Sequence, residues 1–188
     1  KLAEVRVEHI DIGDNLERSP VGKAEWGVAF GEMFDRRRQA VERLAGIEER
    51  YDGRGRAVVR DDSLWVMISS SGMVFPPKVM LKAPWRDTWF GPGDRSYMVR
   101  LINDAGGEYA CRGVDSDQSR AISPAESYLA ASKAHVWLNP GQVHTIAELV
   151  TPNPFFATIP PLERGLVYNS HSPSPPGRGV VYWESGAP

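Results

Sequence analysis

Two histidines on either side of a short turn have the spacing that best suits chemistry in this chain. His135 and His144 bracket eight residues that include the turn Asn139-Pro140-Gly141. The turn could bring both imidazoles into one pocket, where Glu148 would complete an acid–base group. On this alternative the chain is a small enzyme, a hydrolase or group transferase with a histidine-centred pocket. The plainer alternative is two ordinary histidines, one of them at a helix end.

A loop rich in aromatic residues is the most unusual local feature. Trp85, Arg86, Trp89 and Phe90 precede the glycine turn Gly91-Pro92-Gly93. Rings in such a loop suit a surface that binds a partner or the wall of a ligand site. The alternative is a loop whose rings fold back over a sheet. We predict that these four side chains form a binding surface.

No motif in the chain predicts a metal site or a cofactor. Asp115-Ser116-Asp117 offers carboxylates, but Arg120 occupies the sixth position of a calcium loop, where glycine is required. The single cysteine, Cys111, excludes an internal disulfide and a zinc site built on paired cysteines. The glycine turns lack the endings of phosphate-binding loops. The sequence therefore predicts neither metal nor cofactor.

Length and charge limit the class of protein. The 188 residues are 41% hydrophobic and 24% charged, which suits a folded chain with a sizeable core. A net charge of −2 gives no general attraction to phosphate backbones, so nucleic acid is not an expected partner. No run of eighteen apolar residues and no signal peptide are present, so we expect no membrane segment and leave the localisation unknown.

Helix signals are strong in two places. Ser19-Pro20 is a helix-start pair, and apolar residues spaced three and four apart predict one long helix over 23–50, ended by Gly53. The capping box Ser123-Pro124-Ala125-Glu126 predicts a short helix over about 124–135.

Strand signals follow the long helix. Alternating residues predict strands over 56–60 and 64–69. Segments 97–103 and 108–114 flank Asp104-Ala105-Gly106-Gly107, which predicts a hairpin. A further strand is expected over 142–150.

Together these elements predict an α+β fold, with a mostly antiparallel twisted sheet, one long helix packed on a face and one short helix. We expect residues 1–188 to form a single globular domain with a proline-rich, loop-rich C-terminal segment from about residue 151. The predicted core consists of Val5, Val7, Trp26, Phe30, Met33, Leu44, Ile47, Val58, Trp65, Val66, Val99, Leu101, Tyr109, Leu129, Val136, Leu138, Ile146 and Leu149.

The function favoured by these features is that of a protein-interaction or structural module. Because no catalytic template fits, we expect a subunit or a processed piece of a larger assembly. Its partner would be another protein chain, self or non-self, bound through the aromatic loop. The enzyme built on His135, His144 and Glu148 is the alternative.

Overall fold

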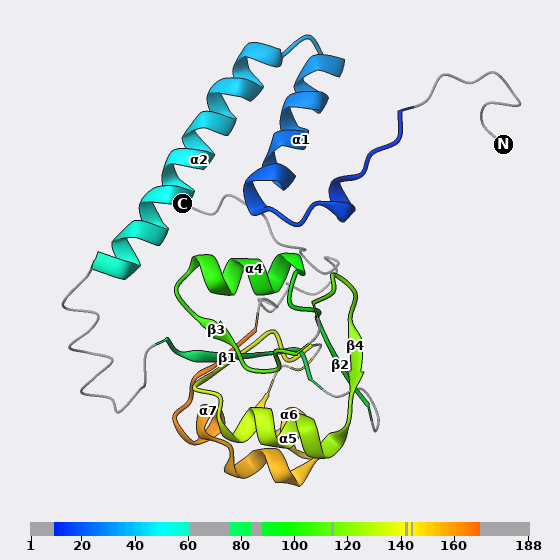
Figure 1. The fold of residues 1–188 in the computed structure, drawn as a ribbon, viewed down its shortest axis with the longest axis vertical. Helices are drawn as coiled ribbons and strands as arrows, with labels where there is room; N and C mark the ends of the chain where they lie inside the picture. The colour runs from blue at the N-terminus through cyan, green and yellow to red at the C-terminus, as the bar shows by residue number, and fades with distance from the viewer. Residues whose placement is uncertain are drawn as a thin grey trace, which may run out of the picture. The chain divides into compact units, whose positions relative to one another are not determined.

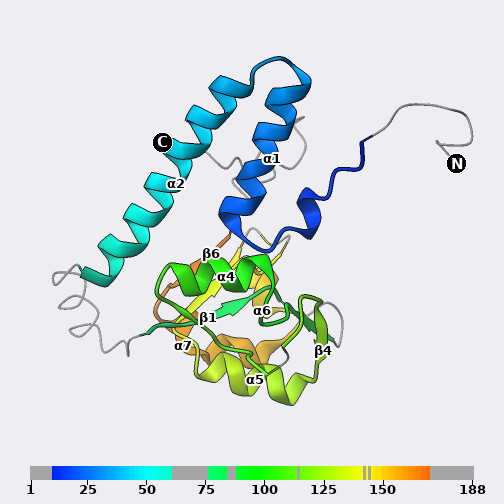
Figure 2. The ribbon, with the colours of Figure 1, turned by 45° about the horizontal axis from the view of Figure 1, so that its top comes forward.

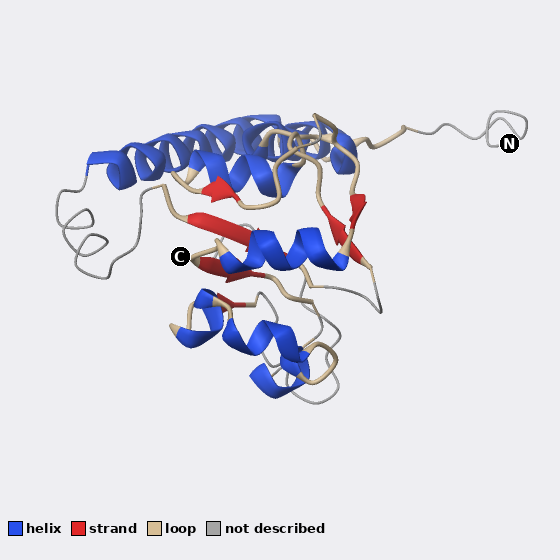
Figure 3. Ribbon diagram, turned by 60° about the horizontal axis from the view of Figure 1, so that its bottom comes forward, coloured by secondary structure: helices blue, strands red, loops and turns tan. Residues whose placement is uncertain are grey.

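The computed structural model describes residues 10–60, 76–83, 88–113, 115–141, 143 and 145–169, with the backbone alone at 54–60. The chain divides into two compact units, Lys1–Arg54 and Gly55–Pro188. Within the described residues every strand belongs to the second unit, and the first unit is helical (Figure 3).

The first unit contains two helices joined by a tight turn. A 3₁₀ turn, η2 (Asp14–Leu16), precedes α1 (Pro20–Met33) and α2 (Arg37–Arg60). Ser19 caps α1 as predicted, because its Oγ accepts the backbone N–H of Gly22 at 3.3 Å. Asp35 takes a left-handed conformation (φ +55°) between the helices, which run antiparallel (Figures 1 and 2).

The prediction of one long helix over 23–50 is therefore wrong. The apolar spacing continues across residues 34–36, but the backbone turns there. Gly53 does not end the second helix either, since α2 continues to Arg60 through a stretch that was predicted as a strand.

Gly31 in α1 leaves space for the first turn of α2 to pack closely against it. A Cβ on the buried Gly31 would lie 2.5 Å from Cβ of Ala40 and 3.3 Å from the carbonyl oxygen of Arg36. Two of the predicted core residues on α1, Phe30 and Met33, are exposed. The absence of a side chain at Gly31 therefore lets Ala40 and the carbonyl of Arg36 approach α1 closely.

The second unit is built on a four-stranded sheet in which every pairing is parallel. Its strands, in spatial order, are β3 (Glu108–Tyr109), β1 (Lys78–Leu81), β5 (Val136–Leu138) and β6 (Val167–Tyr168). A separate antiparallel pair consists of β2 (Trp89–Gly91) and β4 (Arg120–Ile122). The helical segments are α4 (Tyr97–Asp104), α5 (Pro124–Ser132), α6 (Ile146–Val150), η3 (Pro154–Thr158) and α7 (Pro160–Glu163).

Helices cover both faces of this sheet. Figures 1 and 2 show α4 on one face and α5, α6 and α7 on the other. This is an α/β architecture with parallel strands, so the prediction of an α+β fold with a mostly antiparallel sheet is wrong. The two faces are filled because successive crossovers lead in opposite directions from β1.

The predicted hairpin over 97–114 is a helix followed by a parallel strand. Val99 and Ile102, three residues apart, are both buried, and Arg100 pairs with Asp104 at 3.1 Å along the exposed side. Gly107 donates its N–H to the carbonyl of Ile102 at 2.8 Å, and Gly106 has φ +81°. The glycine pair therefore closes the end of α4 in a Schellman motif instead of forming a hairpin turn.

Two further predictions have opposite outcomes. The short helix is confirmed as α5, because Ser123 Oγ accepts the N–H of Glu126 at 3.2 Å. The strand over 142–150 is wrong, since residues 146–150 form α6 with Thr145 as its cap.

The core of the second unit lies between its helices and the sheet. The predicted core residues Val99, Tyr109 and Leu149 are buried there, whereas Leu129 and Ile146 are exposed. The strand predicted over 64–69, with Trp65 and Val66, lies outside the described residues, as do Val5, Val7 and the side chain of Val58. No helix in the part of the chain that the structure describes combines the length and apolarity needed to cross a bilayer.

A matched pair of glycine substitutions in α1 tests the helix contact. Gly31→Ala is expected to lower the free energy of unfolding by roughly 1–3 kcal/mol, because the new methyl group overlaps Ala40. Gly27→Ala is the control, since a Cβ there meets nothing within 4 Å, and it should raise the value by about 0.5–1 kcal/mol. Urea unfolding followed by far-UV circular dichroism gives both values. Equal effects of the two substitutions would contradict this account.

Candidate functional site

The carboxyl ends of the strands form one edge of the parallel sheet, which we call the carboxyl edge. Strand order reverses between β1 and β5, since the chain passes from β1 to β3 on one side and returns to β5 on the other. In open α/β sheets, ligands bind outside the carboxyl ends of the strands at such a switch point. The residues after β1 and β5 therefore form the candidate ligand-binding site.

Two non-glycine residues adopt left-handed backbone at this edge. Lys82 follows β1 with φ +62°, and Asn139 follows β5 with φ +50°. Lys82 donates its N–H to the carbonyl of Leu138 at 3.2 Å, and Asn139 donates its N–H to that of Tyr168 at 2.8 Å. Lys82, Asn139 and Tyr168 thus form a row across the ends of three adjacent strands. Left-handed backbone costs about 1–2 kcal/mol for a residue such as Lys82 and less for an asparagine, and strain of this kind concentrates at functional sites.

An aromatic cluster of Trp89, Trp137 and Phe156 supports the end of β1 from inside. The Nε1 atom of Trp137 donates to the carbonyl of Lys82 at 2.5 Å, and that of Trp89 donates to Leu81 at 3.1 Å. The two indoles are stacked with centroids 5.8 Å apart, and Phe156 meets both edge-on. These three rings are fully buried. The last carbonyls of β1 are therefore fixed in place.

Side chains suited to a ligand lie above this support. Lys82 is exposed, with its Nζ 3.5 Å from Ser119 Oγ, and the ring of Tyr168 is 54% exposed. The amide of Asn169 donates to the carbonyls of Gly141 at 2.7 Å and Val143 at 2.9 Å, which holds the loop after β5. The edge can therefore offer a cation and an aromatic surface to a ligand on a rigid backbone. No sequence motif marks any of these residues.

The aromatic loop predicted as a binding surface leads into this edge. Trp85 and Arg86 lie outside the described residues. Trp89 is buried in the aromatic cluster, and Phe90, the next residue of β2, is 44% exposed. Alternation along a strand explains the contrast, because neighbouring side chains point to opposite faces.

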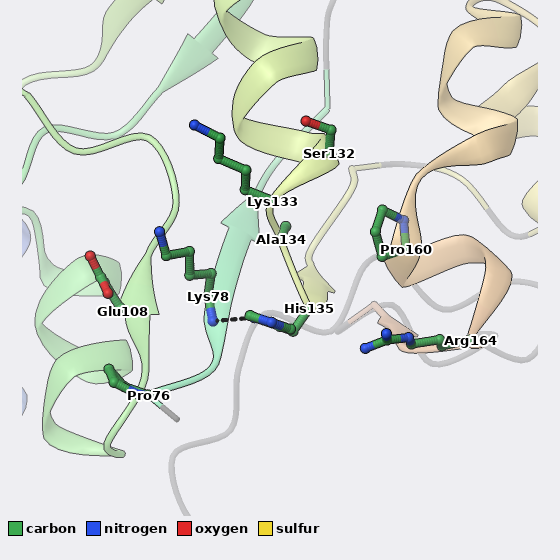
Figure 4. A pocket seen from close by; sticks show the side chains of 9 residues that line it. All are labelled: Pro76, Lys78, Glu108, Ser132, Lys133, Ala134, His135, Pro160 and Arg164. Carbon is green, nitrogen blue, oxygen red and sulfur yellow. Dashed lines mark hydrogen bonds between the residues drawn. The ribbon is translucent and has the colours of Figure 1, made fainter. Parts of the chain in front are cut away.

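A pocket of about 560 Å³ opens at the amino ends of the same strands, which we call the amino-edge pocket (Figure 4). His135 lies in its wall: its N–H donates to the carbonyl of Lys78 at 2.8 Å, and its Nδ1 accepts the N–H of Lys78 at 2.9 Å. The pocket is lined by Pro76, Lys78, Glu108, Ser132, Lys133, Ala134, His135, Pro160 and Arg164.

Burial and the neighbouring positive charges favour the neutral form of His135. Burial lowers the pKa of its imidazole below the ordinary value, and the positive charges of Arg164 and Lys78 lower it further. Because Nδ1 accepts a hydrogen bond, the neutral ring carries its proton on Nε2.

The predicted group of His135, His144 and Glu148 stays a prediction, since His144 lies outside the described residues. Of these three residues, His135 lines the amino-edge pocket. Glu148 is exposed on α6, and its N–H donates to Thr145 Oγ1 at 3.2 Å.

The buried thiol is not poised for nucleophilic chemistry. Burial raises the pKa of Cys111 to about 11, so the thiol is protonated at neutral pH. Burial, together with Cys111, also raises the pKa of Tyr109.

Asp115 and Asp117 pair with Arg95 at 3.3 and 3.4 Å. Among the residues described, no three His, Cys, Asp or Glu side chains are grouped so that they could hold a metal ion.

Comparison with known proteins gives three matches, and no family model matches the chain. An uncharacterized lipoprotein of Methanocaldococcus jannaschii is 22% identical over 171 residues, which are 89% of this chain and 38% of the lipoprotein. A crystal structure of a possible iron-binding (periplasmic solute-binding) protein from Staphylococcus epidermidis has a TM-score of 0.58 at 10% identity, covering 79% of this chain and 53% of that one. The periplasmic heme-binding protein BhuT, in complex with two hemes, has a TM-score of 0.49 at 18% identity, covering 81% and 55%.

The likeness to the S. epidermidis protein shows a shared α/β fold. This chain spans 38% of the length of the lipoprotein and about half of each solved structure. The matches contradict the prediction of a structural or interaction module, an assembly subunit whose partner is another protein chain. The S. epidermidis protein, which shares the fold, is described as a possible iron-binding, periplasmic solute-binding protein and not as part of an assembly.

Strain at the carboxyl edge can be measured by comparing two truncations of one side chain. Lys82→Ala and Lys82→Gly both remove the ammonium group, but only glycine relieves the left-handed backbone. The Gly variant should be more stable by about 0.5–1 kcal/mol, because the relieved strain exceeds the extra chain entropy. Urea unfolding monitored by tryptophan fluorescence supplies the comparison, and a more stable Ala variant would contradict strain at Lys82.

The lowered pKa of His135 predicts that acid destabilises the second unit. At pH values between the pKa of His135 in the folded and in the unfolded chain, the unfolded chain binds more protons. The contribution of the neutral imidazole to the free energy of unfolding is therefore fully present above the unfolded pKa and is lost as the pH falls through the folded pKa. His135→Asn keeps an acceptor for the N–H of Lys78 and removes the titration. Denaturant unfolding at pH 7.5 and pH 5.5 should show a larger acid loss in the wild type than in this variant. The same loss in both would refute the assignment.

Proposed function

We propose that residues 76–169 form a ligand-binding lobe of a solute-binding protein, with the ligand held at the carboxyl edge of β1 and β5. The observation that carries the proposal is the pair of strained residues, Lys82 and Asn139, directly after the two strands that flank the switch point. The fold shared with a protein described as periplasmic solute-binding supports the same class.

The chemistry of the edge suggests the kind of solute. The Lys82 ammonium favours a ligand with negative charge, and the exposed ring of Tyr168 favours one with a flat or apolar surface. The S. epidermidis protein is described as possibly iron-binding. A negatively charged ferric chelate combines these properties, because the chelator can supply both the negative charge and the flat or apolar surface.

The carboxyl edge supplies one wall of the site in this proposal. The match covers 53% of the S. epidermidis protein, so the rest of a protein of that length could form the opposite wall of the site. The aromatic cluster serves as a rigid base, so the ligand meets a surface that is already formed.

Binding can be followed by intrinsic fluorescence, because Trp89 and Trp137 lie directly under the carboxyl edge. Ferric citrate, a ferric tricatecholate and hemin are the probes, each compared with its iron-free form. At least one should quench the fluorescence with saturation. Lys82→Ala should then weaken that binding about tenfold, as expected for loss of a hydrogen bond to a charged group.

The matched control is Lys133→Ala, which removes the same charge from the amino-edge pocket. It should leave chelate binding unchanged. The proposal fails if none of the three probes saturates, or if the two lysine variants weaken binding equally.

A further inference from the structure

The amino-edge pocket gathers basic side chains from separate elements of the fold. Lys78 begins β1, Lys133 follows α5, and Arg164 follows α7. His135 lies between them, and Figure 4 shows the guanidinium of Arg164 extending toward its ring. Glu108 is the one acidic side chain among the described lining residues. Three cations and one carboxylate give the wall a net charge of +2 when His135 is neutral.

Helix ends account for part of this charge. Lys133 and Arg164 directly follow the C-termini of α5 and α7, where a positive charge offsets the helix dipole. Lys78 lies on a strand and has no such role. Among the described residues none of these three cations forms an ion pair. These three positive charges line one pocket and have no ionic partner among the described residues.

We propose that the amino-edge pocket is a binding site, separate from the carboxyl edge, for a small molecule that carries a dianionic phosphate group. Arg164, whose guanidinium extends toward His135 in Figure 4, supplies charge-assisted donors, and the two lysines add positive charge to the wall. The Nε2–H of His135 is the remaining donor of a ring whose Nδ1 is fixed by the N–H of Lys78. A volume of about 560 Å³ lies in the range of small-molecule sites, so space remains beside the phosphate for the rest of the ligand.

Phosphate binding and protonation of His135 must be linked. The cations Arg164 and Lys78 contribute to the lowered pKa of the imidazole, and Lys133 and Glu108 face the same space. A bound dianion adds opposite charge and therefore raises that pKa. By reciprocity, the dianion binds more tightly as the pH falls through the pKa of His135.

The test uses NMR of the histidine imidazoles in the purified protein, with the His135→Asn variant to assign the signal. Inorganic phosphate and glycerol 3-phosphate are titrated at neutral pH, and both should shift the His135 signal with saturation. Tighter binding of glycerol 3-phosphate identifies a phosphate monoester as the ligand class. Equal binding identifies the free ion.

Sulfate isolates the linkage, because it keeps two charges throughout the pH range in which His135 titrates. Saturating sulfate should raise the pKa of His135, whereas sodium chloride at equal ionic strength should leave it nearly unchanged. A response of the same size to both salts would mean screening alone and would overturn the proposal.

Substitutions separate this site from the carboxyl edge. Arg164→Ala should weaken phosphate binding at least about tenfold, and Arg164→Lys should retain part of the affinity. Lys82→Ala removes a positive charge from the carboxyl edge; it is the matched control and should leave the affinity for phosphate at the amino-edge pocket unchanged. Circular dichroism establishes that each variant is folded.

The proposal is overturned if neither phosphate probe saturates in the millimolar range, or if Lys82→Ala weakens phosphate binding as much as Arg164→Ala does. Either result would leave fluorescence quenching by a ferric chelate intact. The two sites can thus fail independently.

Discussion

The parallel pairing of β1 with β5 is the interaction on which the second unit depends. It joins residues 57 positions apart, and side chains reinforce it at both ends. His135 and Lys78 exchange two hydrogen bonds at the amino end, and the indole of Trp137 on β5 donates to the carbonyl of Lys82, just after β1, at the carboxyl end. The switch point and the amino-edge pocket are the two ends of this one ladder. Without the pairing neither surface would be assembled.

Local signals in the sequence predicted local structure well. The caps at Ser19 and Ser123 act within a few residues of themselves, so their patterns are sufficient. The glycine pair at 106–107 was correctly expected to reverse the chain, but a hairpin turn and a helix C-cap use the same residues. Burial of Val99 and Ile102 against the sheet favours the helix C-cap over the hairpin turn, and this contact cannot be predicted from the neighbouring residues alone. Treating 97–103 as a strand turned a parallel sheet into an antiparallel one.

Prediction of the candidate site succeeded only where a residue type is itself informative. His135 was named because an imidazole is chemically unusual, yet its partner Lys78 becomes visible only through strand pairing. Lys82 and Asn139 carry no motif, because left-handed backbone at these residues is a property of the fold. Trp89 was expected at a surface because of its loop. Its indole N–H finds the carbonyl of Leu81 inside the core, which removes the cost of burying that polar group.

Anchoring by side chains also explains how the two proposed binding surfaces can lie at opposite ends of one pair of strands without affecting each other. A shift of β1 at the carboxyl edge would break the indole hydrogen bonds and unstack the aromatic cluster. A shift at the amino end would break the double contact between His135 and Lys78. Close-packed interiors resist such gradual displacement, so each edge presents a preformed surface whose geometry is set by the core. Energetic coupling between two sites requires a structural element that can adopt two arrangements. The β1–β5 ladder is anchored at both ends in one arrangement, so binding at one edge should not change the other.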